Sequence, residues 1–429
     1  MIGVIADDIT GSNDIGVMFR SSGYSADVHS FSRNVLDEIL ADRPDVLIFD
    51  TDSRLDDART AYEKVFQATK SMQKAGAYQF FNKTCSVFRG NIGAEFDAML
   101  DALEEEFAVV VVGFPKNGRL TENSIHYVNG TALASSQFKN DPVHPMTESD
   151  LTEILKNQTE RKVGALHHNV LSQGREVLRD EIRRVKNSGE VNYLILDVTS
   201  QEDLAKIAFA VQDEKILCGS SALGEEIPKV KAKESKGDNE LPFPEWMEGK
   251  GLFCAAGSLT PQTIGQVAYM KEQGFHTVEF DTLSFLRHAD PDTVISELKE
   301  AITTKMVQGH HVILHSSNDP EKVRETKEDG LKQGYDNTAV SRLISDQIAE
   351  ITLNVLERTG QRRFVIAGGD TSAKVCQALG IKGIRIWKEI QPGVPSCLSH
   401  KTPPYLFVLK SGSFGSPDFI ELAFDHLSE

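Results

Sequence analysis

Two adjacent carboxylates follow the first apolar segment of the chain. Asp7 and Asp8 come directly after residues 2–6, whose run of apolar side chains predicts a buried strand. Asn13 and Asp14 stand a few residues further on. Ligands of α/β proteins bind beyond the carboxyl ends of the strands, so these acidic and amide groups are candidates for a ligand site. Helix capping is the structural alternative, and it accounts for only one of the four side chains.

The next two predicted strands also end in polar residues. Arg54 follows the strand predicted at residues 46–49. The strand predicted at residues 77–81 leads into Asn82, Lys83, Thr84 and Cys85. An arginine can hold a carboxylate or a phosphate through two parallel hydrogen bonds, and a lysine adds a point charge. The pattern predicts one anion-binding pocket built from several strand ends, with a solvated or salt-bridged surface role as the alternative for either cation.

Glycine- and serine-rich turns mark three strand ends in the second half of the chain. They are Gly257-Ser258, the run Gly368, Gly369, Asp370 and Thr371, and the run from Gly412 to Gly415. The second turn joins an apolar run to a helical pattern, so its glycines let the backbone approach a ligand and the new helix offers free N–H groups. Each turn by itself is common between a strand and a helix. Together they predict an open, donor-rich floor for the phosphates of a nucleotide.

The order of the segments predicts two doubly wound α/β domains with mainly parallel sheets. Short apolar runs alternate with helical patterns, as in a succession of strand–helix–strand units. Further strands are predicted at residues 108–113, 193–198, 215–218, 252–256, 278–280, 312–315, 364–367, 384–390 and 405–409, and an amphipathic helix at 344–356. Thr10 and Thr260 are expected to cap the helices that follow them. The polar, proline-containing residues 231–245 predict a linker between two domains, residues 1–235 and residues 236–429.

One loop imitates a nucleotide-binding motif without its chemistry. The run from Gly113 to Leu120 has the spacing of a P-loop, but Arg119-Leu120 stands where the motif needs Lys followed by Ser or Thr. The metal-binding hydroxyl is therefore absent, and the run is expected to be a loop that lines the same pocket. His126 and His144 follow it, and neither receives a role because a lone histidine is more often structural than ligating.

Composition limits the partners of the chain. Its 46 Lys and Arg residues against 63 Asp and Glu residues give a net charge of −17, which argues against nucleic acid and membrane surfaces as partners. The five cysteines form no Cys-x-x-Cys pair, so we expect no zinc site and no disulfide framework. The amino terminus lacks the features of a signal peptide, and the cytoplasm is the expected location. These observations leave open whether the chain forms a homodimer.

Four motifs in this order resemble the four-carbon acid sugar kinase family. They are Ala6-Asp7-Asp8-Ile9-Thr10-Gly11 with Asn13-Asp14, the run from Lys83 to Gly93, Ala367-Gly368-Gly369-Asp370-Thr371, and Lys410-Ser411-Gly412-Ser413-Phe414-Gly415. The resemblance spans nearly the whole chain. Members of the family include D-threonate, D-erythronate and 3-oxo-tetronate kinases. The form Lys83-Thr84-Cys85-Ser86 is closer to D-threonate kinases than to members that carry Asp-Ser-Thr at this place.

The resemblance implies an ATP-dependent kinase that phosphorylates the terminal (4-) hydroxyl of a four-carbon sugar acid, with D-threonate as the expected acid. It also implies a cleft between the domains that closes on both substrates. Carried onto this sequence, the substrate-binding residues are Asp8, Arg54, Asn82, Lys83, Thr84 and Cys85. The residues carried over for ATP are Ser258, Gly368, Gly369, Asp370, Thr371 and Gly412.

The chemistry of phosphoryl transfer selects two catalytic candidates. A carboxylate should accept the proton of the attacking hydroxyl, and Asp8 and Asp370 are the candidates. Asp8 is favoured because it belongs to the acid-binding half, whereas Asp370 could equally hold Mg²⁺ through water. Mg²⁺ is expected to arrive with ATP, and the residues predict no protein metal site.

Three alternatives remain open on the sequence. The chain could phosphorylate another small hydroxy acid, such as D-erythronate, 3-oxo-tetronate or glycerate. It could also be a non-catalytic sensor of sugar acids or nucleotides on the same scaffold. A dinucleotide-dependent dehydrogenase is disfavoured, because no Gly-x-Gly-x-x-Gly follows the first predicted strand.

Overall fold

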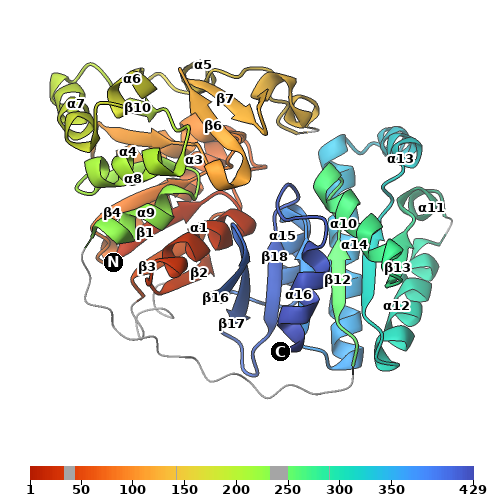
Figure 1. The fold of residues 1–429 in the computed structure, drawn as a ribbon. Helices are drawn as coiled ribbons and strands as arrows, with labels where there is room; N and C mark the ends of the chain where they lie inside the picture. Colours follow the sequence, from red (N-terminus) through yellow and green to blue (C-terminus); the bar gives the residue numbers. More distant parts are fainter. Residues whose placement is uncertain (33–43, 142, 232–249, 289) are drawn as a thin grey trace. The chain divides into compact units, whose positions relative to one another are not determined.

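A computed structural model describes residues 1–32, 44–141, 143–231, 250–288 and 290–429 (Figure 1). The chain divides into two compact units, Met1–Asn239 and Glu240–Glu429, which we call unit 1 and unit 2. Each unit has the predicted α/β architecture. The predicted boundary between residues 235 and 236 lies outside the described residues, as does the predicted linker after Lys231.

The main sheet of unit 1 is parallel in all its described pairings. Its strand order is β2-β3-β1-β4-β11-β5-β10-β9. The strands are β1 (Ile2–Ala6), β2 (Ala26–Ser30), β3 (Val46–Asp50), β4 (Gln79–Lys83), β5 (Ala108–Val111), β9 (Val163–Leu166), β10 (Tyr193–Leu196) and β11 (Ile216–Gly219). Strands buried on both faces read as continuous apolar runs, which is why β1, β3, β5 and β10 could be predicted from the sequence.

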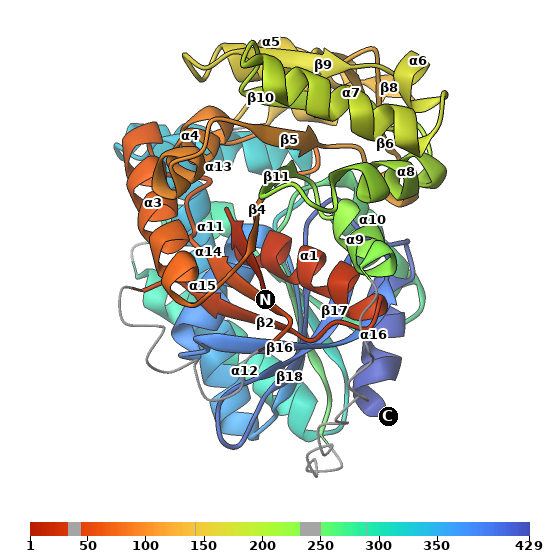
Figure 2. The same cartoon turned by 90° about the vertical axis from the view of Figure 1, so that its left-hand side faces the viewer.

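Helices cover both faces of this sheet (Figure 2). They are α1 (Ile9–Ser21), α3 (Ala58–Lys74), α4 (Ile92–Leu103), α5 (Leu151–Lys156), α6 (His168–Leu171), α7 (Arg175–Ser188), α8 (Gln201–Val211) and α9 (Leu223–Val230). Helices α3 and α4 pack together, and α1, α9, α8 and α7 form a row. In α3 the buried residues Ala61, Val65, Ala68 and Met72 follow helical spacing, and the Asp57 side chain caps the first turn.

Two local predictions for unit 1 were wrong. The fourth strand extends to Lys83 rather than ending at Phe81, because the buried polar side chains of Asn82 and Lys83 form hydrogen bonds to backbone carbonyl groups. Asp8, not Thr10, caps helix α1: its side chain accepts the Gly11 N–H, and the helix already begins at Ile9.

The sequence reading also missed several strands of unit 1. Strand β2 mixes Asp27 and His29 with apolar residues, and β9 contains a glycine, so neither shows a clear apolar run. A separate antiparallel sheet is built from β6 (Arg119–Glu122), β7 (Ile125–Val128) and β8 (Thr131–Ala132). Two short 3₁₀ segments, Leu133–Ser135 and Gln137–Asn140, follow this sheet.

The sheet of unit 2 is parallel at one side and antiparallel at the other. Its strand order is β13-β14-β12-β15-β18-β17-β16, and only β16, β17 and β18 make antiparallel pairs among its described strands. The strands are β12 (Phe253–Ala256), β13 (His276–Phe280), β14 (Val312–Ser316), β15 (Arg363–Ala367), β16 (Gly383–Gln391), β17 (Val394–Ser399) and β18 (Leu406–Lys410). Strand β17 was not predicted, because its alternation of serine with apolar residues is typical of a loop as well as of a strand.

The helices of unit 2 pack in two groups (Figure 1). They are α10 (Pro261–Glu272), α11 (Thr282–Arg287), α12 (Pro291–Val307), α13 (Pro320–Lys332), α14 (Asn337–Thr359), α15 (Gly369–Ala378) and α16 (Phe419–Ser428). Helix α10 packs on α16, and α14 packs on α12, α13 and α15. Pro261 stands at the first helical position of α10, as predicted.

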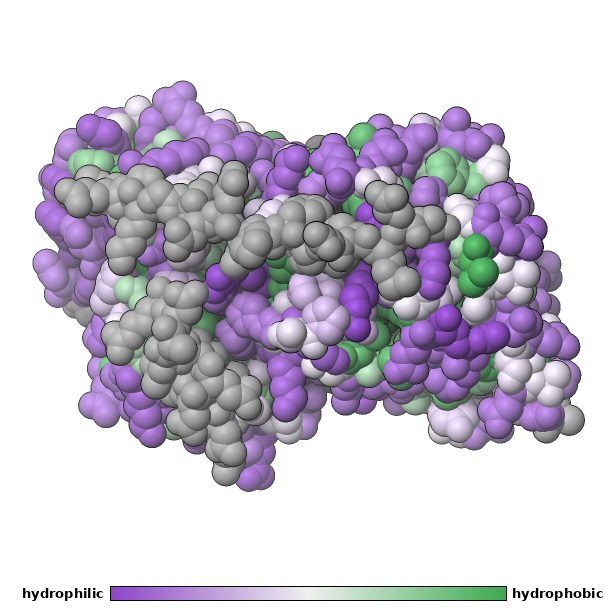
Figure 3. All heavy atoms as spheres, turned by 90° about the horizontal axis from the view of Figure 1, so that it is seen from below, coloured by the Kyte–Doolittle hydropathy of each residue, from purple (hydrophilic) through white to green (hydrophobic). Residues whose placement is uncertain are grey.

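The large exposed hydrophobic residues are spread over several elements of the described chain. In Figure 3 the visible described atoms are mostly hydrophilic, with isolated hydrophobic patches. Large exposed hydrophobic residues include Tyr78, Val307 and Leu331, which lie on separate elements. None of the helices in the described part of the chain is long and apolar enough to cross a membrane.

Candidate active site

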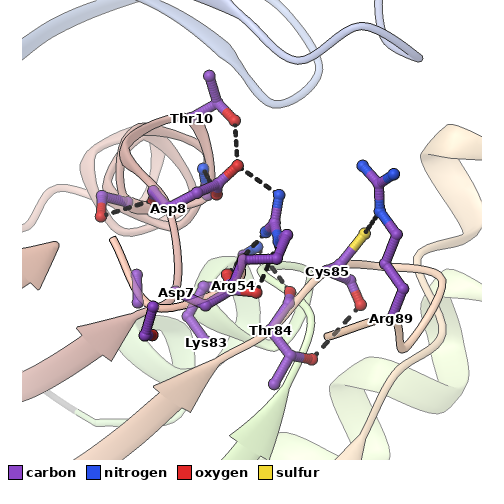
Figure 4. A network of polar contacts seen from close by, with 12 residues as sticks. Asp7, Asp8, Thr10, Arg54, Lys83, Thr84, Cys85 and Arg89 are labelled. Atoms are coloured by element: carbon purple, nitrogen blue, oxygen red, sulfur yellow. Dashed lines mark hydrogen bonds and ion pairs between the residues drawn. The ribbon is translucent and has the colours of Figure 1, made fainter. Parts of the chain in front are cut away.

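The carboxyl ends of β1, β3 and β4 form one edge of the sheet in unit 1. The three strands are neighbours, and Ala6 stands opposite both Asp50 and Lys83. The residues that follow these strands therefore meet, although they are far apart in the sequence. Figure 4 shows the polar side chains that gather there, namely Asp7, Asp8, Thr10, Arg54, Lys83, Thr84, Cys85 and Arg89. We call this group the strand-end cluster.

Arg54 is held in the cluster by two carboxylates. Its Nε and one terminal nitrogen donate to the two oxygens of Asp7, each at 2.7 Å, and its other terminal nitrogen pairs with Asp8. The Arg54 side chain is only 13% exposed. Burial disfavours its charge, but Asp7 and Asp8 outweigh that effect and raise the pKa of Arg54 well above its usual value. Three of the five guanidinium N–H groups are thus used, which leaves two for an incoming anion.

Gly90 lies beside this ion pair and is required by its backbone conformation. Its φ of +113° is rarely adopted by other residues. A Cβ atom there would only make ordinary contacts, at 3.4 Å from Arg54 Cγ and 3.7 Å from Asp7 Oδ2, so the turn after β4 needs the glycine and the ion pair does not.

Asp8 serves helix α1 and the cluster at once. Its Oδ1 accepts the Gly11 N–H at 2.7 Å, and its Oδ2 accepts the Thr10 hydroxyl at 2.8 Å and pairs with Arg54. Burial alone would raise the pKa of Asp8, but Arg54 and then Lys83 outweigh it, so the pKa lies below its usual value. Asp8 is therefore a permanently charged hydrogen-bond acceptor at neutral pH, and a weak base.

Asp14 differs from Asp8 in this respect. Its Oδ2 lies 3.6 Å from Lys83 Nζ and accepts the Ser221 hydroxyl at 2.6 Å, whereas its Oδ1 is buried with no hydrogen-bond partner. Burial raises the pKa of Asp14 to about 6, against the attraction of Lys83. Asp14 therefore titrates closer to neutrality than Asp8. Asp50, the last residue of β3, also has a pKa well above its usual value, because it is buried and lies near Asp52. The sequence singled Asp14 out as a polar group but gave it no catalytic role.

Arg89 is a cluster residue that the sequence prediction of the site left out. Its Nε donates to Cys85 Sγ at 3.3 Å, and a terminal nitrogen pairs with Asp141. Its side chain is 25% exposed, more than that of Arg54. Arg89 stands inside the run that carries the family resemblance, which was the available signal. Its partner Asp141 is distant in the sequence, so the pair could not be predicted.

Not all predicted substrate ligands point into the cluster. Asn82 is fully buried, and its Nδ2 donates to Glu95 O on helix α4 at 3.3 Å. Successive side chains of a strand point to opposite faces, so Asn82 lies toward α4 while Lys83 lies toward α1. Thr84 is also buried, with its hydroxyl 3.4 Å from Cys85 O. Their roles as substrate ligands stay predictions.

Cys85 should react faster with alkylating reagents than the other cysteines. Burial disfavours its thiolate, but Arg89 and Arg54 outweigh it and lower the pKa of the Cys85 thiol, so more thiolate is present at neutral pH. The other four cysteines are buried. Limiting iodoacetamide followed by peptide mass spectrometry should find Cys85 modified first, and a bound sugar acid should slow the reaction. First labelling at Cys218 or Cys254 would contradict this reading.

Three loops of unit 2 leave one edge of its sheet. Strands β12, β15 and β18 are parallel neighbours, with Ala367 opposite both Ala256 and Lys410. The loops that follow them are residues 257–260, 368–371 and 411–416. The Ser258 N–H donates to Ala367 O at 3.2 Å, and the Gly368 N–H donates to Lys410 O at 2.9 Å. The predicted convergence of these three turns is therefore present within unit 2.

Glycine is needed in these loops because the loops lie too close together for a Cβ atom. A Cβ at Gly257 would lie 2.1 Å from Thr371 Oγ1, and one at Gly412 would lie 2.3 Å from Ser258 Oγ. Gly368, with φ of +140°, lies against Ser258 and Thr371. All predicted nucleotide ligands of unit 2 thus belong to one group, which we call the glycine loops.

Helix α15 begins within the glycine loops. It begins at Gly369, and its N-cap residue Gly368 has no side chain to satisfy the first N–H groups. Asp370 lies in the first turn. Thr260 is the N-cap residue of α10, but its hydroxyl donates to Gly412 O at 2.6 Å instead of capping the helix.

The run that imitates a P-loop has a different structure. Residues Pro115–Asn117 form a 3₁₀ turn that leads into β6, and the Lys116 ammonium pairs with Glu225 at 2.7 Å. His126 is buried between Thr121 Oγ1 at 3.0 Å and Ser86 O at 2.9 Å. Burial lowers the pKa of His126 to about 4, so this histidine is a neutral structural bridge.

Comparison with known proteins agrees with this two-part organisation. A family model described as a sugar-binding N-terminal domain matches residues 2–227, and one described as a nucleotide-binding C-terminal domain matches residues 253–420. A protein of Actinobacillus succinogenes named 3-oxo-tetronate kinase is 31% identical over 99% of both chains. One of Pseudomonas savastanoi pv. phaseolicola with the same name is 30% identical over 100% of this chain and 97% of its own.

Solved structures show the same fold over the whole chain. A crystal structure from Haemophilus influenzae has a TM-score of 0.70 and 27% identity, and covers 99% of this chain and 100% of its own. A structure of a protein from Salmonella typhimurium LT2, described as a putative tRNA synthase, has a TM-score of 0.77 and 25% identity, with 98% of both chains covered. The two domain models, in the order that the sequence predicts and over nearly all of its length, show that the chain belongs to the four-carbon acid sugar kinase family, whose members are ATP-dependent sugar-acid kinases.

Proposed function

We propose that this chain transfers the γ-phosphoryl group of ATP to the terminal hydroxyl of a four-carbon sugar acid, with 3-oxo-tetronate as the first candidate acid. The observation that carries the choice of acid is the full-length similarity to proteins named 3-oxo-tetronate kinase. D-Threonate is the second candidate, because Lys83, Thr84 and Cys85 stand where other family members carry Asp-Ser-Thr. D-Erythronate remains a competitor that the same measurement tests.

The strand-end cluster supplies what a sugar acid needs. Arg54 keeps two guanidinium N–H groups beyond its bonds to Asp7 and Asp8, and Arg89 is the more exposed cation beside it. These cations are proposed to hold the carboxylate of the acid. Asp8 is proposed to accept a hydrogen bond from the attacking hydroxyl and to orient it. Phosphoryl transfer depends mainly on position and charge neutralisation, so an oriented acceptor serves better than a strong base.

The glycine loops are proposed to bind ATP through Ser258, residues 368–371 and Gly412. Within the described residues no group of three or more His, Cys, Asp or Glu side chains could hold a metal ion. Mg²⁺ is proposed to be bound mainly by the phosphates of ATP, with Asp370 as the loop carboxylate that could reach it through water. Bound in this way, Mg²⁺ would neutralise charge on the phosphates. The predicted cleft between the domains stays a prediction.

A panel of three four-carbon acids and the three-carbon acid glycerate tests the proposed reaction. Coupled ADP release should show a kcat/KM for 3-oxo-tetronate at least about 10-fold above those for D-threonate, D-erythronate and glycerate, because each lost hydrogen-bond partner costs about 1–3 kcal/mol. Phosphorus NMR of the product should locate the phosphate on the terminal carbon. A preference for D-threonate would move the assignment to the second candidate. Binding of acid and nucleotide without ADP release from any acid would instead identify a non-catalytic sensor.

A further inference from the structure

Lys410 is a buried cation at the base of the third glycine loop. It is the last residue of β18, and it is 0% exposed. Its Nζ lies within 3.0 to 3.2 Å of four acceptors, namely Thr263 Oγ1, Ser411 O, Gly412 O and Phe414 O. No carboxylate of the described residues forms an ion pair with it. A buried ammonium group without a counter-ion is rare and costly, so its presence needs an explanation.

Neighbouring side chains hold the same loop from the same side. Gly412 O accepts the hydroxyls of Thr260 at 2.6 Å and Thr263 at 3.0 Å in addition to Lys410. Gln266 on α10 is also fully buried, and its Nε2 lies 3.0 to 3.1 Å from the carbonyl oxygens of residues 414, 415 and 416. The carbonyl groups of residues 411, 412, 414, 415 and 416 are thus all turned toward Lys410 and α10.

This arrangement fixes the direction of the backbone N–H groups. In a trans peptide unit the N–H points away from the C=O. With the carbonyls of residues 411, 412 and 414 turned inward, the N–H groups of residues 412, 413 and 415 point to the opposite side of the loop. The intervening Phe414 N–H donates to Ser411 O at 3.2 Å, within the loop. Outward N–H groups of a turn form an anion-binding concavity. Gly412 belongs to this set, and it lies against Ser258 of the first glycine loop.

We propose that Lys410 is a positioning residue for the phosphates of the nucleotide. Its ammonium group holds the carbonyls of Ser411, Gly412 and Phe414, which aims the amides of residues 412, 413 and 415 at the phosphates. Its charge stands directly behind these amides and attracts the phosphates through them. This inference rests on the proposed nucleotide site. It adds Lys410 to that site as a residue that acts through the loop and does not contact the nucleotide.

The charge of Lys410 gives the proposal a second, independent readout. Burial lowers the pKa of Lys410 to about 7, and among the described residues the neutral Cys254 thiol, whose pKa burial raises to about 12, is the titratable group that acts on it. Helix α10 presents Thr263 to Lys410, Gln266 shares the acceptor Phe414 O with it, and α16 presents the Phe419 ring. The protonated form favours phosphate, so at pH 8 nucleotide binding should take up a proton. The affinity for the nucleotide should rise as the pH falls from 8 toward 7, and it should change little at lower pH once Lys410 is protonated in the free protein.

Calorimetric titration of the full chain with ADP, AMP and adenosine tests two expectations, namely that Lys410 strengthens binding of the phosphates and that binding takes up a proton. We expect Lys410→Met to raise the Kd for ADP about 10-fold, the Kd for AMP less, and the Kd for adenosine not at all. At pH 8 the terminal phosphate, with a last pKa of about 6, is already deprotonated. Titrations in buffers of different ionisation enthalpy should therefore show proton uptake by the wild type and none by Lys410→Met.

Arg363→Met is the matched control. Arg363 is also a buried cation of this sheet, but it stands at the amino end of β15 and donates to Leu427 O, away from the glycine loops. This variant should bind ADP like the wild type and retain the proton uptake. Equal weakening of ADP and adenosine by Lys410→Met would indicate a packing role only and would overturn the proposal.

The remaining outcomes are separable. If Lys410→Met does not fold, the wild-type titration decides alone, and absence of proton uptake at pH 8 overturns the proposal. ADP binding that is the same in the wild type and in Lys410→Met overturns this proposal and leaves the proposed function standing. Absence of any nucleotide binding to the wild type overturns the proposed function and this inference with it.

Discussion

Replacement of Asp8 by Asn should lower kcat about 100-fold while leaving the fold intact. Asn is as good an N-cap residue as Asp, so it can still accept the Gly11 N–H that begins helix α1. Arg54 also keeps its two hydrogen bonds to Asp7. What is lost is the charged carboxylate proposed to orient the attacking hydroxyl and to accept its proton, and loss of a positioned proton acceptor typically costs 10²–10⁴-fold in rate. Steady-state kinetics with the preferred acid, together with a thermal melt, checks both parts.

Asp57→Asn is the matched control for this variant. Asp57 caps helix α3 as Asp8 caps α1, with its side chain accepting the N–H groups of Arg59 and Thr60. It lies outside the strand-end cluster, so kcat should not change. If Asp8→Asn keeps near wild-type turnover, Asp8 has no catalytic role. If both variants lose activity and both melt at lower temperature, the loss of activity comes from weakened helix capping and not from catalysis.

The pH dependence separates Asp8 from Asp14 as the group that accepts the proton. The pKa of Asp8 is lowered, so Asp8 stays ionised throughout the neutral range and contributes no acidic limb there. Asp14 has a pKa of about 6, so a base role for Asp14 would make kcat fall as the pH drops through 6. We expect a flat profile between pH 6 and 7. An acidic limb near pH 6 that disappears in Asp14→Asn would transfer the role to Asp14.

Gly412→Ala should raise the KM for ATP about 30-fold without changing the KM for the acid. The new Cβ would lie 2.3 Å from Ser258 Oγ and 3.0 Å from Thr260 Cγ2. The loop cannot retreat easily, because Gly412 O is held by Thr260, Thr263 and Lys410. Overpacking of this kind costs about 1–3 kcal/mol, and about 2 kcal/mol corresponds to the expected change.

Gly265→Ala provides the control within the same unit. Gly265 lies on the exposed side of α10, and a Cβ there would meet no atom within 4 Å. Replacing a helical glycine by alanine should stabilise the chain by about 0.5–1 kcal/mol and leave both KM values unchanged. Equal KM changes for ATP and the acid in Gly412→Ala would show that the substitution acts on the whole fold and not on the nucleotide loops.

The sequence by itself determined the α/β class, most strands of the two sheets and the positions of the functional loops. This was possible because parallel strands buried on both faces leave continuous apolar runs, and because ligand sites of such sheets follow the strand ends. Asp8, Arg54 and Lys83 could be grouped on that ground alone, and so could the three glycine loops. Four motifs in a fixed order then identified the family.

Only the tertiary structure decided what each side chain does within these groups. It turned Asn82 toward α4, because neighbouring residues of a strand face opposite sides of the sheet. It made Asp8 a helix cap and ion-pair partner, and it buried Asp14 so that the pKa of this carboxyl is raised. It also paired Arg89 with Asp141 and placed Lys410 behind the third glycine loop. Such contacts join residues distant in the sequence, and burial and charge around them set each pKa, so local patterns carry no information about them.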